Sequence, residues 1–211
     1  MSVLTALAPD PYRPGYRLVE VDRGRFASLG EAVLEPLGLV VGAALAPEVL
    51  ARLHALADAE AALRAAVRML GLRAHARGDL GRRLIARQHA PRAVESALTT
   101  LAARGLLDDR AFAERYAATR ARRGRGPVRL VRDLLAQGVD RGTAEAAVAA
   151  GLRAEGIDLQ REARRLAERR MRALARRPGP ERRRQLAGYL VRRGYSVADA
   201  QSVARELCPN S

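Results

Sequence analysis

One pattern of leucine, turn and small apolar residues occurs three times in this 211-residue chain. Its first leucines are Leu84, Leu134 and Leu190, which lie at successive offsets of 50 and 56 residues. Each copy predicts a helix, a turn that usually carries glycine and a second helix, and each follows another amphipathic helix. The unit is therefore three helices, present three times. Because a unit of about 50 residues is only marginally stable alone, we expect neighbouring units to stack into an elongated or curved array.

The first part of the chain follows a different pattern. Residues 16–21 alternate polar and apolar side chains before a turn with Asp and Gly, and an apolar segment follows at 26–29, which predicts a β-hairpin. From Pro47 the apolar residues recur at helical spacing. We therefore expect a mainly α fold with a small N-terminal β-hairpin module, nine helices of about 10 to 18 residues after it, and Gly71 as the first break. The expected domains are the hairpin module at 1–46 and three helical repeats at 47–106, 107–155 and 156–208.

The chain is strongly basic, with 38 arginines, no lysine and 23 acidic residues, for a net charge of +15. This balance favours acidic partners, nucleic acid above all. A GC-rich coding sequence also explains the choice of arginine over lysine, so only the charge itself carries weight. The first 60 residues hold 5 arginines against 8 acidic residues, so the positive charge belongs to the repeats. Aromatic residues are only 3%, which argues against a surface that stacks many bases.

The single cysteine, Cys208, excludes an internal disulfide and a cysteine-based zinc cluster, and indicates a reducing, cytoplasmic location. Residues 1–10 lack the pattern of a secretory leader, and apolar runs such as 39–45 are too short to cross a bilayer. We expect no contact with a membrane.

Catalytic patterns are missing from the sequence. His54, His75 and His89 are separated singles, a phosphate-binding Gly-x4-Gly-Lys cannot exist without lysine, and no Gly-x-Ser-x-Gly occurs. His89 occupies a turn position of the repeat, and Cys208 lies near the end of the chain. We expect no enzyme, no metal site and no cofactor.

The most distinctive segment begins the second repeat. Asp108 is placed to cap a helix, Asp109 complements the positive end of the helix dipole, and Phe112 and Tyr116 share one helical face. The alternative, an acid pair for metal binding or general acid–base work, has no third ligand nearby in sequence. We therefore favour a structural role.

Two segments concentrate arginine. Residues 120–132 hold six arginines and no acid, and residues 160–195 hold thirteen arginines and three acids. A solvated helix face is the alternative explanation, but the two runs and the net charge together favour a binding surface. The candidate binding residues are Arg120, Arg122, Arg123, Arg125, Arg129, Arg132, Arg169, Arg170, Arg172, Arg182, Arg183, Arg192 and Arg193.

These features together resemble the RecX regulators of the RecA recombinase over nearly the whole chain. The third-repeat pattern of that family is similar to residues 190–196, which include Gly194 and Tyr195. Three positions depart from the pattern of the family. In the first repeat Ala76 stands where a helix-starting serine is usual and Gln88 where the turn glycine is usual, so we expect the second helix of that repeat to begin less sharply. In the second repeat Asp133, at the acid that usually precedes Leu134, is a mild change. The family marker is similar to Leu107, Asp108, Asp109, Phe112, Ala113, Tyr116, Gly126, Leu134, Gly138 and Val139.

The resemblance implies a monomeric, non-enzymatic regulator in DNA repair, recombination and the SOS response. It would bind the groove of a RecA–DNA filament and inhibit the ATPase, recombinase and coprotease activities of RecA. The alternative class is a helical repressor or architectural protein that binds single- or double-stranded DNA directly. A base-reading helix would carry Asn, Gln, Ser or Thr beside its basic residues, whereas the corresponding helices here are rich in alanine. A pure scaffold would not need this charge, and the sequence leaves open whether the basic faces contact DNA or RecA.

Overall fold

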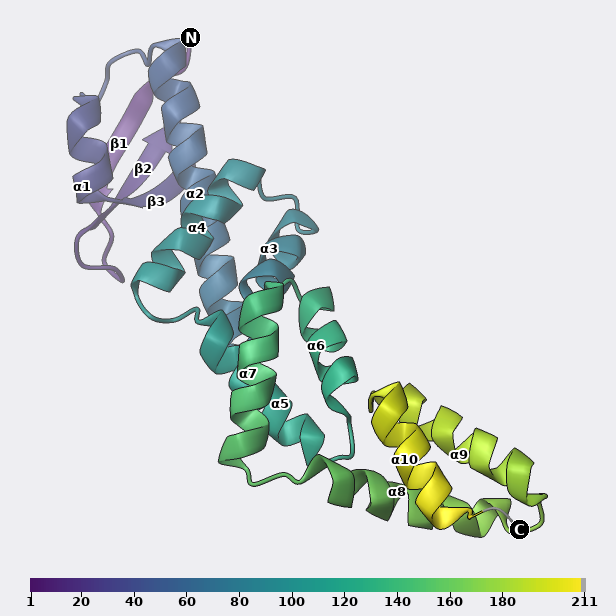
Figure 1. Ribbon diagram of the computed structural model, residues 1–211. Helices are drawn as coiled ribbons and strands as arrows, with labels where there is room; N and C mark the ends of the chain where they lie inside the picture. The colour runs from purple at the N-terminus through teal and green to yellow at the C-terminus, as the bar shows by residue number, and fades with distance from the viewer. Residues whose placement is uncertain (210–211) are drawn as a thin grey trace. The chain divides into compact units, whose positions relative to one another are not determined.

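The computed structural model describes residues 1–209, which form two compact units (Figure 1). The first unit contains residues 1–74 and 80–107, and the second contains residues 75–79 and 108–209. The elements are β1 (Leu4–Pro9), β2 (Tyr16–Val21), β3 (Gly24–Gly30), α1 (Glu31–Leu34), the 3-10 helix η1 (Glu35–Leu37), α2 (Pro47–Leu72), α3 (Arg77–Ile85), α4 (Pro91–Ala103), α5 (Asp109–Ala121), α6 (Pro127–Ala136), α7 (Arg141–Ala154), α8 (Leu159–Leu174), α9 (Gly179–Arg193) and α10 (Val197–Leu207).

The N-terminal module is a three-stranded antiparallel sheet in the order β1-β2-β3. Strands β2 and β3 are the predicted hairpin, and β1 is a strand that the sequence analysis missed. The β1 segment, Leu-Thr-Ala-Leu-Ala-Pro, contains alanine and proline, which are depleted in strands. It becomes a strand through its pairing with β2, where Leu7 opposes Val19.

Helix α2 belongs to two cores. Its first half packs on the sheet through Leu53, which is fully buried with Leu4 and Val19. Its second half buries Ala66 and Met69 against α3 and α4. The prediction of helices of 10 to 18 residues is wrong for α2, which has 26 residues and continues through Gly71 to its last turn. Tertiary contacts on both halves offset the cost of one helical glycine.

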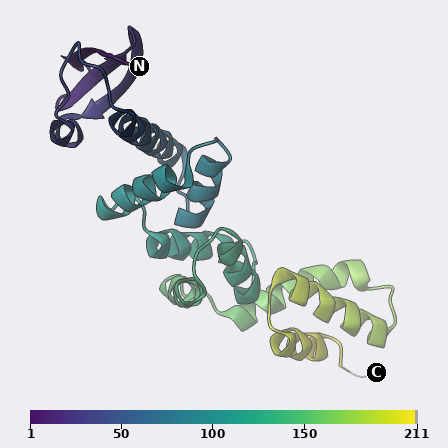
Figure 2. The same ribbon diagram turned by 90° about the horizontal axis from the view of Figure 1, so that it is seen from above.

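The second unit contains two three-helix cores. One is built by α5, α6 and α7 around Leu130, Leu134 and Val148, and the segment 75–79 contributes Ala76 to it. The other is built by α8, α9 and α10 around Leu186 and Leu190. Figure 2 shows these last three helices, coloured from green to yellow, packed against one another.

The turns of the three copies share a left-handed residue. Gly138 follows α6 with φ 85° and Gly194 follows α9 with φ 94°. At the first copy Gln88 takes the same conformation, with φ 65°. The left-handed region disfavours residues with a Cβ atom. Gln88 therefore adopts the turn conformation of the other two copies at the cost of local backbone strain.

The predicted fold class is confirmed. Nine helices follow residue 46 in the part of the chain that the structure describes, and no strand there lies beyond Gly30. The same residues contain no helix that is long and apolar enough to cross a bilayer.

Candidate anion-binding site

The site lies in the second unit, where the C-terminal end of α9 meets the N-terminal end of α6. The Gly126 amide donates to the Arg193 carbonyl at 2.8 Å, and the Val128 amide donates to the Gly194 carbonyl at 3.0 Å. The first N–H groups of α6 therefore satisfy the last carbonyl groups of α9. A Cβ atom on Gly126 would lie 2.3 Å from the Gly194 carbonyl carbon, so this close backbone contact requires glycine.

Four arginines and one tyrosine line a pocket of about 360 Å³ at this contact. Tyr189 lies on α9 one turn before its end, and the guanidinium carbon of Arg193 is 5.3 Å from the centre of its ring. The guanidinium carbon of Arg170, from α8, lies 5.7 Å from the same ring. Both are cation–π distances, so Tyr189 helps to position two arginines from different helices. The pocket residues are Arg125, Arg129, Tyr189, Arg192 and Arg193.

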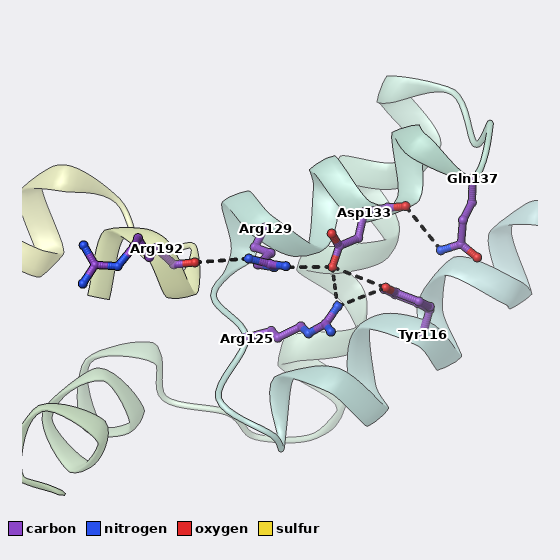
Figure 3. Close-up of polar contacts among 6 residues, drawn as sticks. All are labelled: Tyr116, Arg125, Arg129, Asp133, Gln137 and Arg192. Atoms are coloured by element: carbon purple, nitrogen blue, oxygen red, sulfur yellow. Dashed lines mark hydrogen bonds and ion pairs between the residues drawn. The ribbon is translucent and has the colours of Figure 1, made fainter. Parts of the chain in front are cut away.

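Asp133 of α6 anchors one side of the pocket (Figure 3). Arg125 donates to its carboxylate through Nη1 at 2.5 Å, and the Tyr116 hydroxyl donates to the same oxygen at 3.4 Å. The Nε atom of Arg129 is 3.9 Å from that oxygen, and its Nη1 donates to the Arg192 carbonyl at 3.4 Å. The guanidinium group of Arg192 points away from this network (Figure 3).

The pocket has more positive than negative charge. Asp133 is shared by Arg125 and Arg129, whereas Arg192 and Arg193 have no carboxylate within ion-pairing distance in residues 1–209. Burial and the nearby charge of Asp133 raise the pKa of Tyr116, so its phenol stays neutral and donates to Asp133. Guanidinium groups are always charged and present a fork of donors that fits oxyanions. The arrangement can therefore hold an anion through hydrogen bonds and charge.

The thirteen arginines predicted from the sequence do not form one site. Arg125, Arg129, Arg192 and Arg193 come together in the pocket, as described above. Of the others in residues 120–132, Arg120 lies over the Tyr116 ring, Arg122 pairs with Glu155, and Arg123 and Arg132 are exposed. In the C-terminal bundle, Arg169, Arg170 and Arg172 are exposed on α8, and Arg182 and Arg183 are half-buried on α9.

The acidic pair at the start of the second repeat caps two helices. The Ala111 amide donates to Asp108 at 2.9 Å, which caps α5. The Arg77 amide donates to Asp109 at 2.7 Å. Asp109 lies in the first turn of α5, but its carboxylate also caps the start of α3. This carboxylate accepts from the first amide of α3, a role that the side chain of Ala76 cannot fill.

The remaining marker residues lie in the core or at turns. Tyr195 is 3% exposed, and burial, together with the nearby Glu162 carboxylate, raises its pKa to about 12.

No three His, Cys, Asp or Glu side chains group as metal ligands within residues 1–209. Of the other marker residues, Leu107, Phe112, Ala113, Leu134 and Val139 are buried, Gly126 packs on Gly194, and Gly138 follows α6.

Sequence reasoning missed two residues of the site. Asp133 is the acid that binds Arg125 and Arg129, and the spacing of Arg129 and Asp133 by four residues is a signal of that pairing. Tyr189 was not singled out, although it precedes Arg193 by four residues on α9. Both signals place residues on one helix, and neither shows that the two helices meet.

Comparison with known proteins identifies the family. The model of the second three-helix domain of RecX matches residues 108–148, and that of the third matches residues 158–203. The regulatory protein RecX of Halorhodospira halophila is 36% identical over 148 residues, which cover 70% of this chain and 89% of that protein. The RecX of Cronobacter sakazakii is 33% identical over 150 residues, with coverage of 66% and 88%.

Solved structures agree in fold. The crystal structure of a regulatory protein RecX superposes with a TM-score of 0.75 at 20% identity, covering all of both chains. The RecX of Lactobacillus salivarius gives a TM-score of 0.62 at 19% identity, covering 71% of this chain and 96% of that one. With the sequence matches along most of the relatives' lengths, these comparisons establish that the chain belongs to the RecX family of regulatory proteins.

Proposed function

We propose that this protein binds the groove of the RecA–DNA filament and inhibits the ATPase, recombinase and coprotease activities of RecA. The observation that carries the proposal is membership of the RecX regulatory family, with relatives matched along 89% and 88% of their lengths. The arginine-lined pocket supports it, because a filament that contains DNA presents phosphate groups. The protein acts as a monomer in the cytoplasm and uses no cofactor.

A RecA ATPase assay on single-stranded DNA tests this function. The full chain is titrated into preformed filaments, and the rate of ATP hydrolysis is expected to fall in a saturable way. A rate that stays constant across the titration would refute the proposal.

Direct binding to nucleic acid is the second candidate, and the arginine pocket favours it. Helix α7 argues against base reading, because Thr143 is its one residue of the Asn, Gln, Ser and Thr group that reads base edges. Binding to RecA–DNA filaments, naked DNA and free RecA, each at two salt concentrations, separates the candidates. A filament regulator binds the filament far more tightly than either component, whereas a direct DNA binder holds naked DNA equally well.

A further inference from the structure

The contact that carries the arginine pocket has a counterpart inside the same unit. The segment 75–79 begins α3 and packs on the turn after α6, where a Cβ atom on Gly78 would lie 2.7 Å from the Gly138 Cα atom. In the same way the start of α6 packs on the turn after α9 at Gly194. The start of the second helix of one repeat thus contacts a turn glycine in both cases.

The side chains at the two contacts differ in charge. The pocket contact carries four arginines and a tyrosine, whereas the counterpart carries no arginine at the corresponding positions. His75 and Asp79 are hydrogen-bonded there, with Nδ1 and Oδ2 2.7 Å apart. The repeat offsets of 50 and 56 match Arg125 to His75, Arg129 to Asp79, Tyr189 to Asp133, Arg192 to Ala136 and Arg193 to Gln137.

This difference argues that the arginines are not needed to form the contact. Glycine turns bring backbone together in both places, yet the pocket arginines have no arginine at their counterpart positions. The negative end of the α9 dipole favours cations, whereas the last turn of α6 contains no basic residue of its own. Positive charges held together repel one another, and that repulsion is relieved when an anion binds.

The chemistry of the pocket favours phosphate over a protein carboxylate. A single guanidinium is enough for a carboxylate, as Arg165 shows with two donors on Glu162 at 2.6 and 3.1 Å. Arginines from the start of α6 and the end of α9 instead suit a ligand whose oxygens point in several directions. The one aromatic residue of the pocket, Tyr189, combines with this charge as in sites that track single-stranded nucleic acid.

We propose that this pocket binds a backbone phosphate of single-stranded DNA. The inference rests on the proposed function, because it assigns the pocket to the DNA strand of the filament rather than to RecA. Arg193 and Arg129 donate to the phosphate from the two sides of the contact, and the exposed Arg192 turns toward it. Tyr189 positions Arg193 beside the phosphate.

The test replaces two pocket arginines with the residues at the corresponding positions of the contact after α6. The double variant Arg192→Ala/Arg193→Gln carries the residues found at 136 and 137, and a fluorescent oligothymidine reports binding to the full chain without RecA. We expect affinity at low salt to fall about tenfold or more, because one charge-assisted hydrogen bond contributes on that order. The slope of log affinity against log salt should fall by about 1.4, since each single-strand contact contributes about 0.7.

A matched control removes the same charge elsewhere. Arg141→Ala/Arg164→Ala deletes two exposed arginines of the same unit, each paired with a glutamate four residues on. Its affinity and salt slope should stay within about twofold of wild type, because surface substitutions have small effects. Equal losses in both double variants would overturn the inference, since net charge alone would then explain binding. Arg193→Lys keeps the charge without the guanidinium fork, and circular dichroism checks that each variant is folded.

Further experiments distinguish single-stranded DNA from other sources of phosphate, and distinguish failure of this inference from failure of the proposed function. Tighter binding of a duplex of the same length, or displacement of oligothymidine by micromolar ATP, would overturn the assignment to single-stranded DNA. Wild-type protein that fails to slow the RecA ATPase refutes the proposed function, while loss of naked-DNA binding in the pocket variant still supports the pocket. A pocket variant that holds oligothymidine normally but no longer inhibits RecA would show that the pocket contacts RecA, which overturns the inference alone.

Discussion

Replacing Gly126 with alanine is expected to break the contact between α6 and α9. The backbone at Gly126, with φ −76° and ψ 162°, is open to any residue, so the substitution adds no conformational strain. The new methyl group would lie 2.3 Å from both the carbon and the oxygen of the Gly194 carbonyl and 2.5 Å from the Tyr195 nitrogen. All three are backbone atoms, which cannot rotate away as a side chain would, so the start of α6 must move.

The size of the effect follows from what that movement removes. Forcing one methyl group into a packed contact costs about 1 to 3 kcal/mol. The bonds from Gly126 to Arg193 and from Val128 to Gly194 lengthen, and each contributes about 1 kcal/mol net. When both bonds are lost, we expect the free energy of unfolding of the second unit to fall by about 3 to 5 kcal/mol. The loss cannot exceed what the contact itself contributes, because beyond that point α6 and α9 simply separate.

Urea unfolding followed by circular dichroism measures the global loss, and amide hydrogen exchange reports the local one. The Val128 amide should exchange much faster in Gly126→Ala, while the Leu130 amide, bonded within α6 to the carbonyl of residue 126, should lose less protection. Gly142→Ala is the control, because its Cβ atom would meet nothing closer than an Asp140 carboxylate oxygen at 3.4 Å. That change should be neutral or stabilise by up to about 1 kcal/mol. Wild-type urea stability together with unchanged Val128 exchange in Gly126→Ala would refute the described contact.

Three further substitutions test local features of the fold. Asp108→Ala removes the cap on the Ala111 amide and should lower stability by about 1 kcal/mol in a urea titration; unchanged stability with lost RecA inhibition would make Asp108 a binding residue. Gln88→Gly relieves a left-handed side-chain residue and should stabilise by about 0.5 to 1 kcal/mol, after the entropy of glycine is counted, and a lower melting temperature would contradict this. Hydrogen bonds from Thr143 hold the pKa of Asp140 below 3.8, so its carboxylate stabilises the fold fully above that pH and less as pH falls through the folded-state pKa. The stability gap between wild type and Asp140→Ala should therefore be widest near neutral pH and shrink below about pH 4, and a gap independent of pH would exclude this role.

The repeat and its helices could be predicted because their signals are local and periodic. Apolar residues at helical spacing, proline at helix starts and glycine at turns act over a few residues, and three copies reinforce one another. The same reasoning missed β1, because Leu4–Pro9 is a strand only when β2 lies beside it. It also misjudged α2, whose length depends on packing at both of its halves.

The sequence by itself determined a mainly α chain of three-helix repeats with its arginines in the repeats, since periodicity and charge are properties of neighbouring residues. Which arginines act together was decided only by the tertiary structure. Arg129 meets the Arg192 carbonyl across 63 positions of the chain, and Asp109 reaches the Arg77 amide across 32. The first pair forms where Gly126 and Gly194 let two backbones approach closely. No pattern along the sequence predicts which backbones come this close, because the contact forms only when the helices pack together.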